Sequence, residues 1–249
     1  LVIQNCYFEE AEQGMLFLGN SYTNLTIGGS PGKGNHFKDL QVGIFCLHGE
    51  EVFARFSHNK IENIGNRAGI YIVQGIGFPP DWEYNVGKCK FHVHDNDIEV
   101  DGIYGDGMRL FDYAAISDES LASEMHIQKN NITLSGGGYE AGVWSIGLHD
   151  AKFISNEISG NGNEGFTFYG LNRTCHLMNN NLRKLDANTT DIHLSPWTSD
   201  FKIVCERGLT DITDNGTNNK IVGPYMKGNA TSMENKEKKA LGKERIMTY

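Results

Sequence analysis

Asparagine recurs along most of this chain, and each time a large apolar residue follows two positions later. Successive asparagines are between 24 and 37 residues apart. The pairs are Asn35/Phe37, Asn59/Ile61, Asn96/Ile98, Asn130/Ile132, Asn156/Ile158 and Asn180/Leu182, with a weaker copy at Asn5 before Tyr7 and Phe8. A repeat of this length is typical of a supersecondary unit that stacks on copies of itself, so the spacing predicts a solenoid.

One short segment precedes most of these asparagines and a second follows them. The first segment carries an apolar residue three positions before the asparagine, at Phe56, Val93, Ile127, Phe153, Leu177 and, one coil further on, Ile203. The second segment follows the asparagine and in most coils opens with glycine; its copies are 43–46, 69–72, 107–110, 142–145, 165–168 and 191–194. Both segments alternate with the period of a strand, and neither is long enough for a helix. The sequence therefore predicts an all-β chain whose parallel strands stack about 4.8 Å apart.

These features resemble the right-handed parallel β-helix repeat proteins of the pectin-lyase-like superfold. The resemblance rests on the asparagine column, the Asn-x-Ile pairs and the Gly-Ile-x-apolar segments. It covers residues 1–225 and implies about eight coils with inserted loops. In that family, stacked asparagines lie in a turn and bond to one another along the axis, because an amide carries both donors and acceptors. The resemblance implies the same scaffold role here.

The catalytic signatures of the enzymes in this superfold are incomplete in this chain. Segments 191–193 and 47–49 match only fragments of the polygalacturonase-like motifs. Asp106, Arg109 and Asp112 match part of the acid and arginine set of the calcium-dependent lyases. The resemblance therefore implies a fold and a substrate class, and assigns no family's catalytic residues.

The repeat predicts one β-helix domain over residues 1–225 and a charged C-terminal tail or cap over 226–249. Residues 233–241 are rich in lysine and glutamate and predict a short charged helix. The chain begins directly in strand-like sequence at 1–5, whereas the end of a solenoid needs a cap over its core. We therefore expect a further partner, which is an N-terminal cap or the remainder of a longer chain.

Charge and composition exclude several functions. The net charge of −9 argues against nucleic acid and repels polyuronates unless a cation intervenes. No apolar run approaches the roughly 20 residues of a membrane span, so from these residues we expect neither a membrane span nor a signal peptide. The five cysteines are odd in number and scattered, which favours free buried thiols over a disulfide framework, and Cys46 and Cys175 fall at inward positions. His92 and His94 alternate on one strand but form no convincing motif, so no metal is expected.

Two coils carry long insertions, at 75–84 after Asn59 and at 112–121 after Asn96. Insertions in a solenoid become loops, often on the binding face. The alternative is that they are inert decorated turns.

The glycine segments show which side chains face outward. If the residue after the glycine points inward, the next residue points outward, as does the residue two positions further on. This alternation gathers aromatic residues on one face, namely Tyr71, Phe111, Trp144, Tyr169 and Trp197. Exposed aromatic rings beside carboxylates suit the flat faces of sugars, so these residues are candidates for substrate binding. The alternative is that the inserted loops cover the rings and form a second core.

Asp106 and Glu164 are the best candidate pair of catalytic carboxylates, because they occupy one column two coils apart. Two strand spacings separate their backbones by about 9.6 Å, close to the roughly 6.5–9.5 Å between the carboxyl groups of inverting glycosidases. Arg109 is a candidate binder of a substrate carboxylate or base of a lyase, His193 a candidate general acid or base, and Asp112 an alternative carboxylate. The alternatives are solvated turn carboxylates, an ion pair of Arg109 with an aspartate, and a polar surface role for His193.

We therefore predict a secreted, cell-surface or periplasmic protein that acts on a polysaccharide or oligosaccharide, as a hydrolase or lyase. No cofactor is expected, except Ca²⁺ for a lyase. The alternative is a non-catalytic carbohydrate-binding, adhesion or structural β-helix protein. A groove holding Asp106, Arg109 and Glu164 beside exposed Trp144 and Tyr169 would favour the enzyme. Scattered side chains, or surface ion pairs beneath the loops, would disfavour it.

Overall fold

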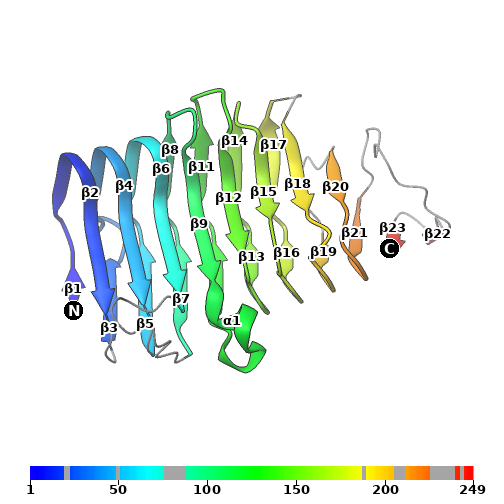
Figure 1. The fold of residues 1–249 in the computed structure, drawn as a ribbon. Coiled ribbons are helices and arrows are strands. Elements are labelled where there is room, and N and C mark those ends of the chain that lie inside the picture. The colour runs from blue at the N-terminus through cyan, green and yellow to red at the C-terminus, as the bar shows by residue number, and fades with distance from the viewer. Residues whose placement is uncertain are drawn as a thin grey trace.

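The computed structural model describes residues 1–19, 23–48, 51–75, 88–186, 189–204, 211–224, 239–241 and 244–248. Its parallel strands stack in chain order as the coils of a parallel β-helix (Figure 1). In this part of the chain one sheet has 11 strands and the other has 12. The predicted all-β solenoid is therefore confirmed.

The 11-stranded sheet collects the segments that precede the asparagine turns, and these strands are parallel. Its parallel strands are β1 (Val2–Ile3), β3 (Thr23–Gly28), β5 (Val52–Ser57), β7 (Lys90–His94), β10 (Glu124–Gln128), β13 (Lys152–Ile154), β16 (His176–Met178), β19 (Lys202–Val204) and β21 (Lys220–Pro224). Two antiparallel strands complete it, β23 (Glu244–Thr248) and β22 (Lys239–Leu241).

The 12-stranded sheet collects the segments that follow the asparagine turns. It begins with three long strands, β2 (Tyr7–Gly19), β4 (His36–His48) and β6 (Lys60–Gln74). Strand β6 pairs with two later strands at once, so the sheet divides beyond it. One branch is β8 (Asp97–Val100), β11 (Asn131–Leu134), β14 (Glu157–Gly160) and β17 (Asn181–Leu185); the other is β9 (Asp106–Asp112), β12 (Ala141–Ile146), β15 (Glu164–Phe168), β18 (Thr190–Leu194) and β20 (Ile212–Asp214).

The pairing register confirms the columns predicted from the repeat. The apolar column before the asparagines runs through Phe56, Val93, Ile127, Phe153, Leu177 and Ile203. The outward column after the glycines runs through Phe45, Tyr71, Arg109, Trp144, Thr167 and His193. Neighbours in a column lie one strand spacing apart, so residues distant in sequence meet in space.

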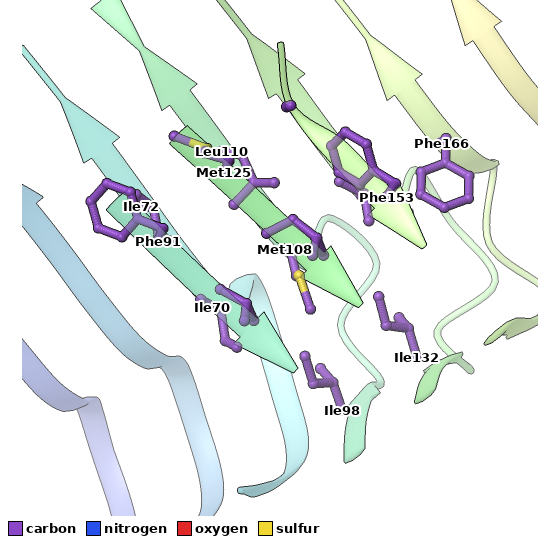
Figure 2. Packing of buried hydrophobic residues seen from close by; sticks show 14 of the residues in the cluster. Ile70, Ile72, Phe91, Ile98, Met108, Leu110, Met125, Ile132, Phe153 and Phe166 are labelled. Carbon is purple, nitrogen blue, oxygen red and sulfur yellow. The ribbon is translucent and has the colours of Figure 1, made fainter. Parts of the chain in front are cut away.

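The apolar core fills the inside of the coils. Figure 2 shows Ile70 and Ile72 of β6 beside Met108 and Leu110 of β9, and all four side chains are fully buried. Each buried side chain of this size stabilises the fold by roughly 1.5–3 kcal/mol relative to exposure. The stacked core therefore gives the outward side chains of β9 and its neighbours a rigid base.

The asparagines form a hydrogen-bonded ladder inside the turn. Asn96 donates from Nδ2 to Oδ1 of Asn130 at 2.9 Å, and its backbone N–H donates to the same oxygen at 3.1 Å. Its Nδ2 also donates to the backbone oxygen of Phe56 at 3.0 Å. The Nδ2-to-Oδ1 bond links, in chain order, Asn35, Asn59, Asn96, Asn130, Asn156 and Asn180. These side chains are at most 2% exposed, so the column has the scaffold role that the resemblance implies.

The first predicted copy of the repeat is displaced by one residue. Tyr7 pairs with His36, which places Cys6, and not Asn5, at the ladder position beside Asn35. The backbone N–H of Cys6 donates to Oδ1 of Asn35 at 3.0 Å. Asn5 instead has a φ of 54°, like the residue before most later ladder asparagines, such as Asp95. The prediction of Asn5 as a ladder member is therefore wrong.

The predicted insertions and tail have different outcomes. Residues 112–121 contain the short helix α1 (Tyr113–Ser117) and the 3₁₀ turn η1 (Glu119–Leu121). The other insertion lies outside the described residues beyond Gly75. Of the helix predicted at 233–241, residues 233–238 are also outside them, and Lys239–Leu241 form strand β22, so helix is wrong at those three positions.

Two further predictions were buried free thiols and the absence of a membrane span. Cys46 and Cys175 are free and buried, Cys89 is a buried thiol that donates to Oε1 of Gln74 at 3.0 Å, and Cys6 is free and exposed. Thus the two thiols predicted to point inward do so. No helix among the described residues has the length and hydropathy needed to cross a bilayer.

Candidate functional site

A cleft on the 12-stranded sheet brings together four of the predicted site residues. Asp106 and Arg109 come from β9, Trp144 from β12 and Glu164 from β15. The register aligns Asp106, Ala141 and Glu164 across these three strands. The cleft has a volume of about 220 Å³, and its lining is Tyr104, Asp106, Arg109, Tyr139, Ala141, Trp144, Glu164 and Thr167. The small side chain of Ala141 therefore stands between the two carboxylates.

Asp106 is the more deeply buried carboxylate, at 4% exposure. Its Oδ2 accepts a hydrogen bond from Nε of Arg109 at 2.5 Å, and its Oδ1 accepts one from the backbone N–H of Ala141 at 2.9 Å. Burial raises the pKa of Asp106 to about 6, although Arg109 and the Ala141 N–H act in the opposite direction. Asp106 is therefore a carboxyl group that can hold a proton up to about pH 6.

Arg109 is fixed by three kinds of contact. Besides Asp106, its Nη2 donates to the backbone oxygen of Tyr104 at 3.0 Å. Its guanidinium carbon lies 5.3 Å from the ring centroid of Trp144 and 5.9 Å from that of Tyr71. Each cation–π contact adds about 0.5–1 kcal/mol at a partly exposed site. The predicted alternative of an ion pair with an aspartate is thus realised inside the cleft, with Asp106.

Glu164 differs from Asp106, because its hydrogen bonds favour the ionised carboxylate. Its Oε1 lies 2.8 Å from Nδ1 of His193, and its Oε2 accepts a hydrogen bond from the hydroxyl of Thr167. Burial acts to raise the pKa of Glu164, but the hydrogen bonds from His193 and Thr167 outweigh this effect. The net result is a lowered pKa. The bond to Glu164 raises the pKa of His193. The two carboxylates of the cleft therefore differ in their readiness to hold a proton.

Two stacked tyrosines at the cleft were not predicted from the sequence. Tyr104 and Tyr139 lie in the turns before β9 and β12, with parallel rings whose centroids are 5.7 Å apart. They are 56% and 71% exposed, so their faces are accessible. Both residues stand two positions before the column of Asp106 and Ala141, and this shared offset is the signal in the sequence that would have found them.

The predicted aromatic patch is divided in the structure. Phe111 is 6% exposed and packs edge-on against Tyr71, Trp144 and Tyr113, with centroids 5.2–6.0 Å apart. Phe111 thus follows the covered-core alternative. Tyr169 and Trp197 are exposed, and their ring centroids are 6.1 Å apart. Neither residue lines the cleft.

A second hollow lies further along the molecule. Trp197 lines it together with Glu119, His149 and Arg173, and its volume is about 440 Å³. The predicted aromatic residues therefore line two separate depressions, with Trp144 in the cleft and Trp197 in the second hollow.

Asp112, the third predicted carboxylate, anchors the inserted segment. It is 1% exposed and is the N-cap of α1, accepting hydrogen bonds from the backbone N–H groups of Ala115 at 3.1 Å and Ser123 at 2.7 Å. Burial raises its pKa. Both of its oxygens are thus engaged by the backbone, away from the cleft.

Groups of side chains suited to a metal lie elsewhere. Across the described ranges, two groups of three residues have donor atoms within 4.8 Å of one another, and both lie on or beside the 11-stranded sheet. They are His92/Glu124/His126 and His58/His94/Asp95. The cleft itself offers carboxylates, an arginine, a histidine behind Glu164, and aromatic rings.

Comparison with family models, with curated proteins and with solved structures finds no match to this chain. The geometry of the cleft is therefore the basis for assigning a function.

Proposed function

We propose that this protein is a polysaccharide hydrolase of the inverting type, with Asp106 as general acid and Glu164 as general base. The observation that carries the proposal is the shared position of these residues on β9 and β15, in one cleft and with only Ala141 between them. Their backbones are two strand spacings, or about 9.6 Å, apart. Inverting enzymes hold their carboxyl groups roughly 6.5–9.5 Å apart, which leaves room for the attacking water.

The divergent pKa values of the pair fit these two roles. Asp106, with a pKa of about 6, would donate its proton to the glycosidic oxygen as the bond from that oxygen to the anomeric carbon breaks. Glu164, with its lowered pKa, would take a proton from the water whose oxygen bonds to the anomeric carbon. Arg109 would stabilise the Asp106 carboxylate left behind, and His193 would orient Glu164.

The aromatic lining supports a sugar ring as the bound group. Trp144, Tyr104 and Tyr139 present rings to the cleft beside polar groups. Sugars offer an apolar face to such rings and hydroxyls to the carboxylates. The same coil architecture occurs in the pectin-lyase-like superfold, and we extend the proposal to membership of that superfold. That extension is an analogy of fold, so the chemistry rests on the cleft.

A panel of neutral and acidic polysaccharides, incubated with the purified full chain, tests the proposal. We expect new reducing ends, a product whose anomeric configuration is inverted by NMR, and a kcat about 10²–10⁴ lower for Asp106→Asn and for Glu164→Gln. Asp150→Asn and Glu99→Gln, at exposed positions outside the cleft, are matched controls that should retain activity. Unsaturated products absorbing in the ultraviolet, or a retained anomer, would contradict the inverting mechanism.

A second candidate function is glycan binding without turnover. It is favoured by the closed network around the carboxylates, since Asp106 is bonded to Arg109 and Ala141 while both oxygens of Glu164 are bonded. Binding in the panel with no new reducing ends would select this function, as in an adhesin. The pairing of Arg109 with Asp106 disfavours the arginine as the base of a lyase, because that role requires a neutral guanidine.

A further inference from the structure

A cluster of three potential metal ligands lies on the outer face of the 11-stranded sheet, away from the cleft. His92 of β7 pairs in register with His126 of β10, and Glu124 lies two residues before His126 on the same strand face. One donor atom from each of the three lies within 4.8 Å of the other two. These residues are 32 or more positions apart across the two strands, so only the stacking of coils brings them together.

His92 carries a polar atom that the protein leaves unsatisfied. Its Nε2 is buried and has no hydrogen-bond partner among the described residues. Its ring stacks on that of His126, with centroids 5.0 Å apart and planes at 1°. A buried nitrogen without a hydrogen-bond partner destabilises the folded state. A bound cation would remove this destabilisation, because the lone pair of a neutral imidazole is a ligand as well as an acceptor.

We propose that His92, Glu124 and His126 bind a divalent transition metal ion, best matched by Zn²⁺. Donor atoms around tetrahedral zinc, each about 2.0–2.1 Å from the ion, are about 3.4 Å apart. Nε2 of His126 already lies 3.3 Å from Oε1 of Glu124. The donor atoms lie within 4.8 Å of one another, so His92 has to approach by at most about 1.4 Å, and rotation about the soft χ2 torsion of histidine allows this. Oε2 of Glu124 meanwhile keeps its ion pair with Nζ of Lys90 at 3.1 Å.

The surroundings select the class of metal. Arg55 and Lys152 occupy the same column on either side of the two histidines and repel cations. Ions such as Mg²⁺ and Ca²⁺ depend on oxygen ligands and gain little from imidazole. Zinc binds imidazole nitrogen and carboxylate oxygen directly, so ligand chemistry offsets the repulsion. Three protein ligands leave a fourth position for water.

The cluster also has a route from solvent. Glu124 and His126 line a groove of about 600 Å³, together with Lys90, Lys152 and His176. A metal ion can enter along this groove and reach His92 last. The site would fasten β7 to β10, the strands on either side of the coil that carries α1.

Zinc titration of the full chain after removal of metal by a chelator tests the proposal. Isothermal titration calorimetry should show one zinc per chain, and the thermal midpoint of unfolding should rise with zinc concentration. We expect His92→Gln and His126→Gln each to weaken zinc binding at least tenfold. Both side chains lie outside the core, so circular dichroism of the metal-free variants should match the wild type. Mg²⁺ and Ca²⁺ should not compete.

Matched histidine controls separate this site from other causes of zinc binding. His176 stands two coils along the same column, and His176→Gln should bind zinc like the wild type. His94→Gln disrupts the second group, in which Nδ1 of His94 already bonds Oδ2 of Asp95 at 2.7 Å, and it should also retain binding. Loss in His94→Gln but not in His126→Gln, or equal affinity in the wild type and the His92/His126 double variant, would overturn the proposal.

Discussion

The asparagine ladder and the carboxylate column of the cleft are both rows of aligned residues, but they are built on opposite rules. The ladder repeats one residue, and each amide bonds the same residue in the next coil. The carboxylate column changes at every coil, reading Val42, Ala68, Asp106, Ala141, Glu164 and Thr190. Both rows follow the same backbone register. The comparison shows that a repeated residue stabilises every coil, whereas a column whose residue varies confines the reactive groups to a few coils.

The largest expected effect comes from breaking the ladder. Asn130→Ala removes the donor to Val93 and the acceptor shared by the backbone and side chain of Asn96. Several buried polar groups lose partners, so we expect the free energy of unfolding to fall by about 4 kcal/mol in chemical denaturation. Asn131→Ala, at the adjacent exposed position, should cost no more than about 0.5 kcal/mol. Equal losses would show that the ladder contributes no special stability.

The next effect is a pH dependence that belongs to the cleft. Burial raises the pKa of Asp106 from its ordinary 3.8 to about 6 in the folded protein. A raised folded pKa gives stability that is fully present below the unfolded pKa and is lost as the pH rises through about 6. At about 1.4 kcal/mol per pH unit, the loss approaches 3 kcal/mol. Denaturant unfolding from pH 3 to 8 should show this slope in the wild type and Asp150→Asn, and a weaker one in Asp106→Asn.

A smaller effect is expected at the rim of the cleft. Tyr139 is 71% exposed, so Tyr139→Ala should change the free energy of unfolding by about 0.5 kcal/mol or less. Loss of a stacking ring should nevertheless weaken binding of the oligosaccharide found in the panel about tenfold, measured by calorimetry. Tyr169→Ala, at an exposed tyrosine outside the cleft, is the matched control. If Tyr169→Ala weakens binding and Tyr139→Ala does not, the ligand lies outside the cleft, beside Tyr169 and Trp197.

The smallest effect concerns the pair of His193 and Glu164. The pKa of His193 is raised, so its stabilisation is present below about 6.5 and lost as the pH rises through the higher folded value. The pKa of Glu164 is lowered, so its stabilisation is present above about 4.5 and lost on acidification. His193→Gln should therefore lower the free energy of unfolding most between these two pH values, by about 1 kcal/mol for this partly buried pair, and less at pH 9. A cost that does not vary with pH would exclude an ionic pair.

Periodicity explains which parts of the fold were predictable. Side chains that repeat at fixed positions, such as Asn96 and Ile98, revealed the coils because the same contact recurs in each. Cys6 completes the ladder through its backbone N–H, which leaves no mark in the residue sequence. Lys239–Leu241 has the composition of a helix, but pairing with β23 overrides that local preference.

Periodicity also explains which residues of the candidate site were predictable. Asp106, Arg109, Trp144 and Glu164 sit in strand columns, so strand spacing alone placed them together. Tyr104 and Tyr139 lie in turns outside the strand columns, and only their shared offset of two positions before Asp106 and Ala141 marks them in the sequence. Asp112 and Phe111 belong to the junction with α1, where an aspartate before a helical segment is an N-cap signal.

Every amide in the asparagine ladder points the same way. Nδ2 faces the next coil and Oδ1 faces the preceding one, from Asn35 to Asn180. Aligned amide dipoles add, as they do along an α-helix, and each bond polarises the next. The β-helix therefore has an electrical polarity along its axis that net charge does not reveal. Its negative pole lies toward Cys6, and its positive pole lies toward Asn180.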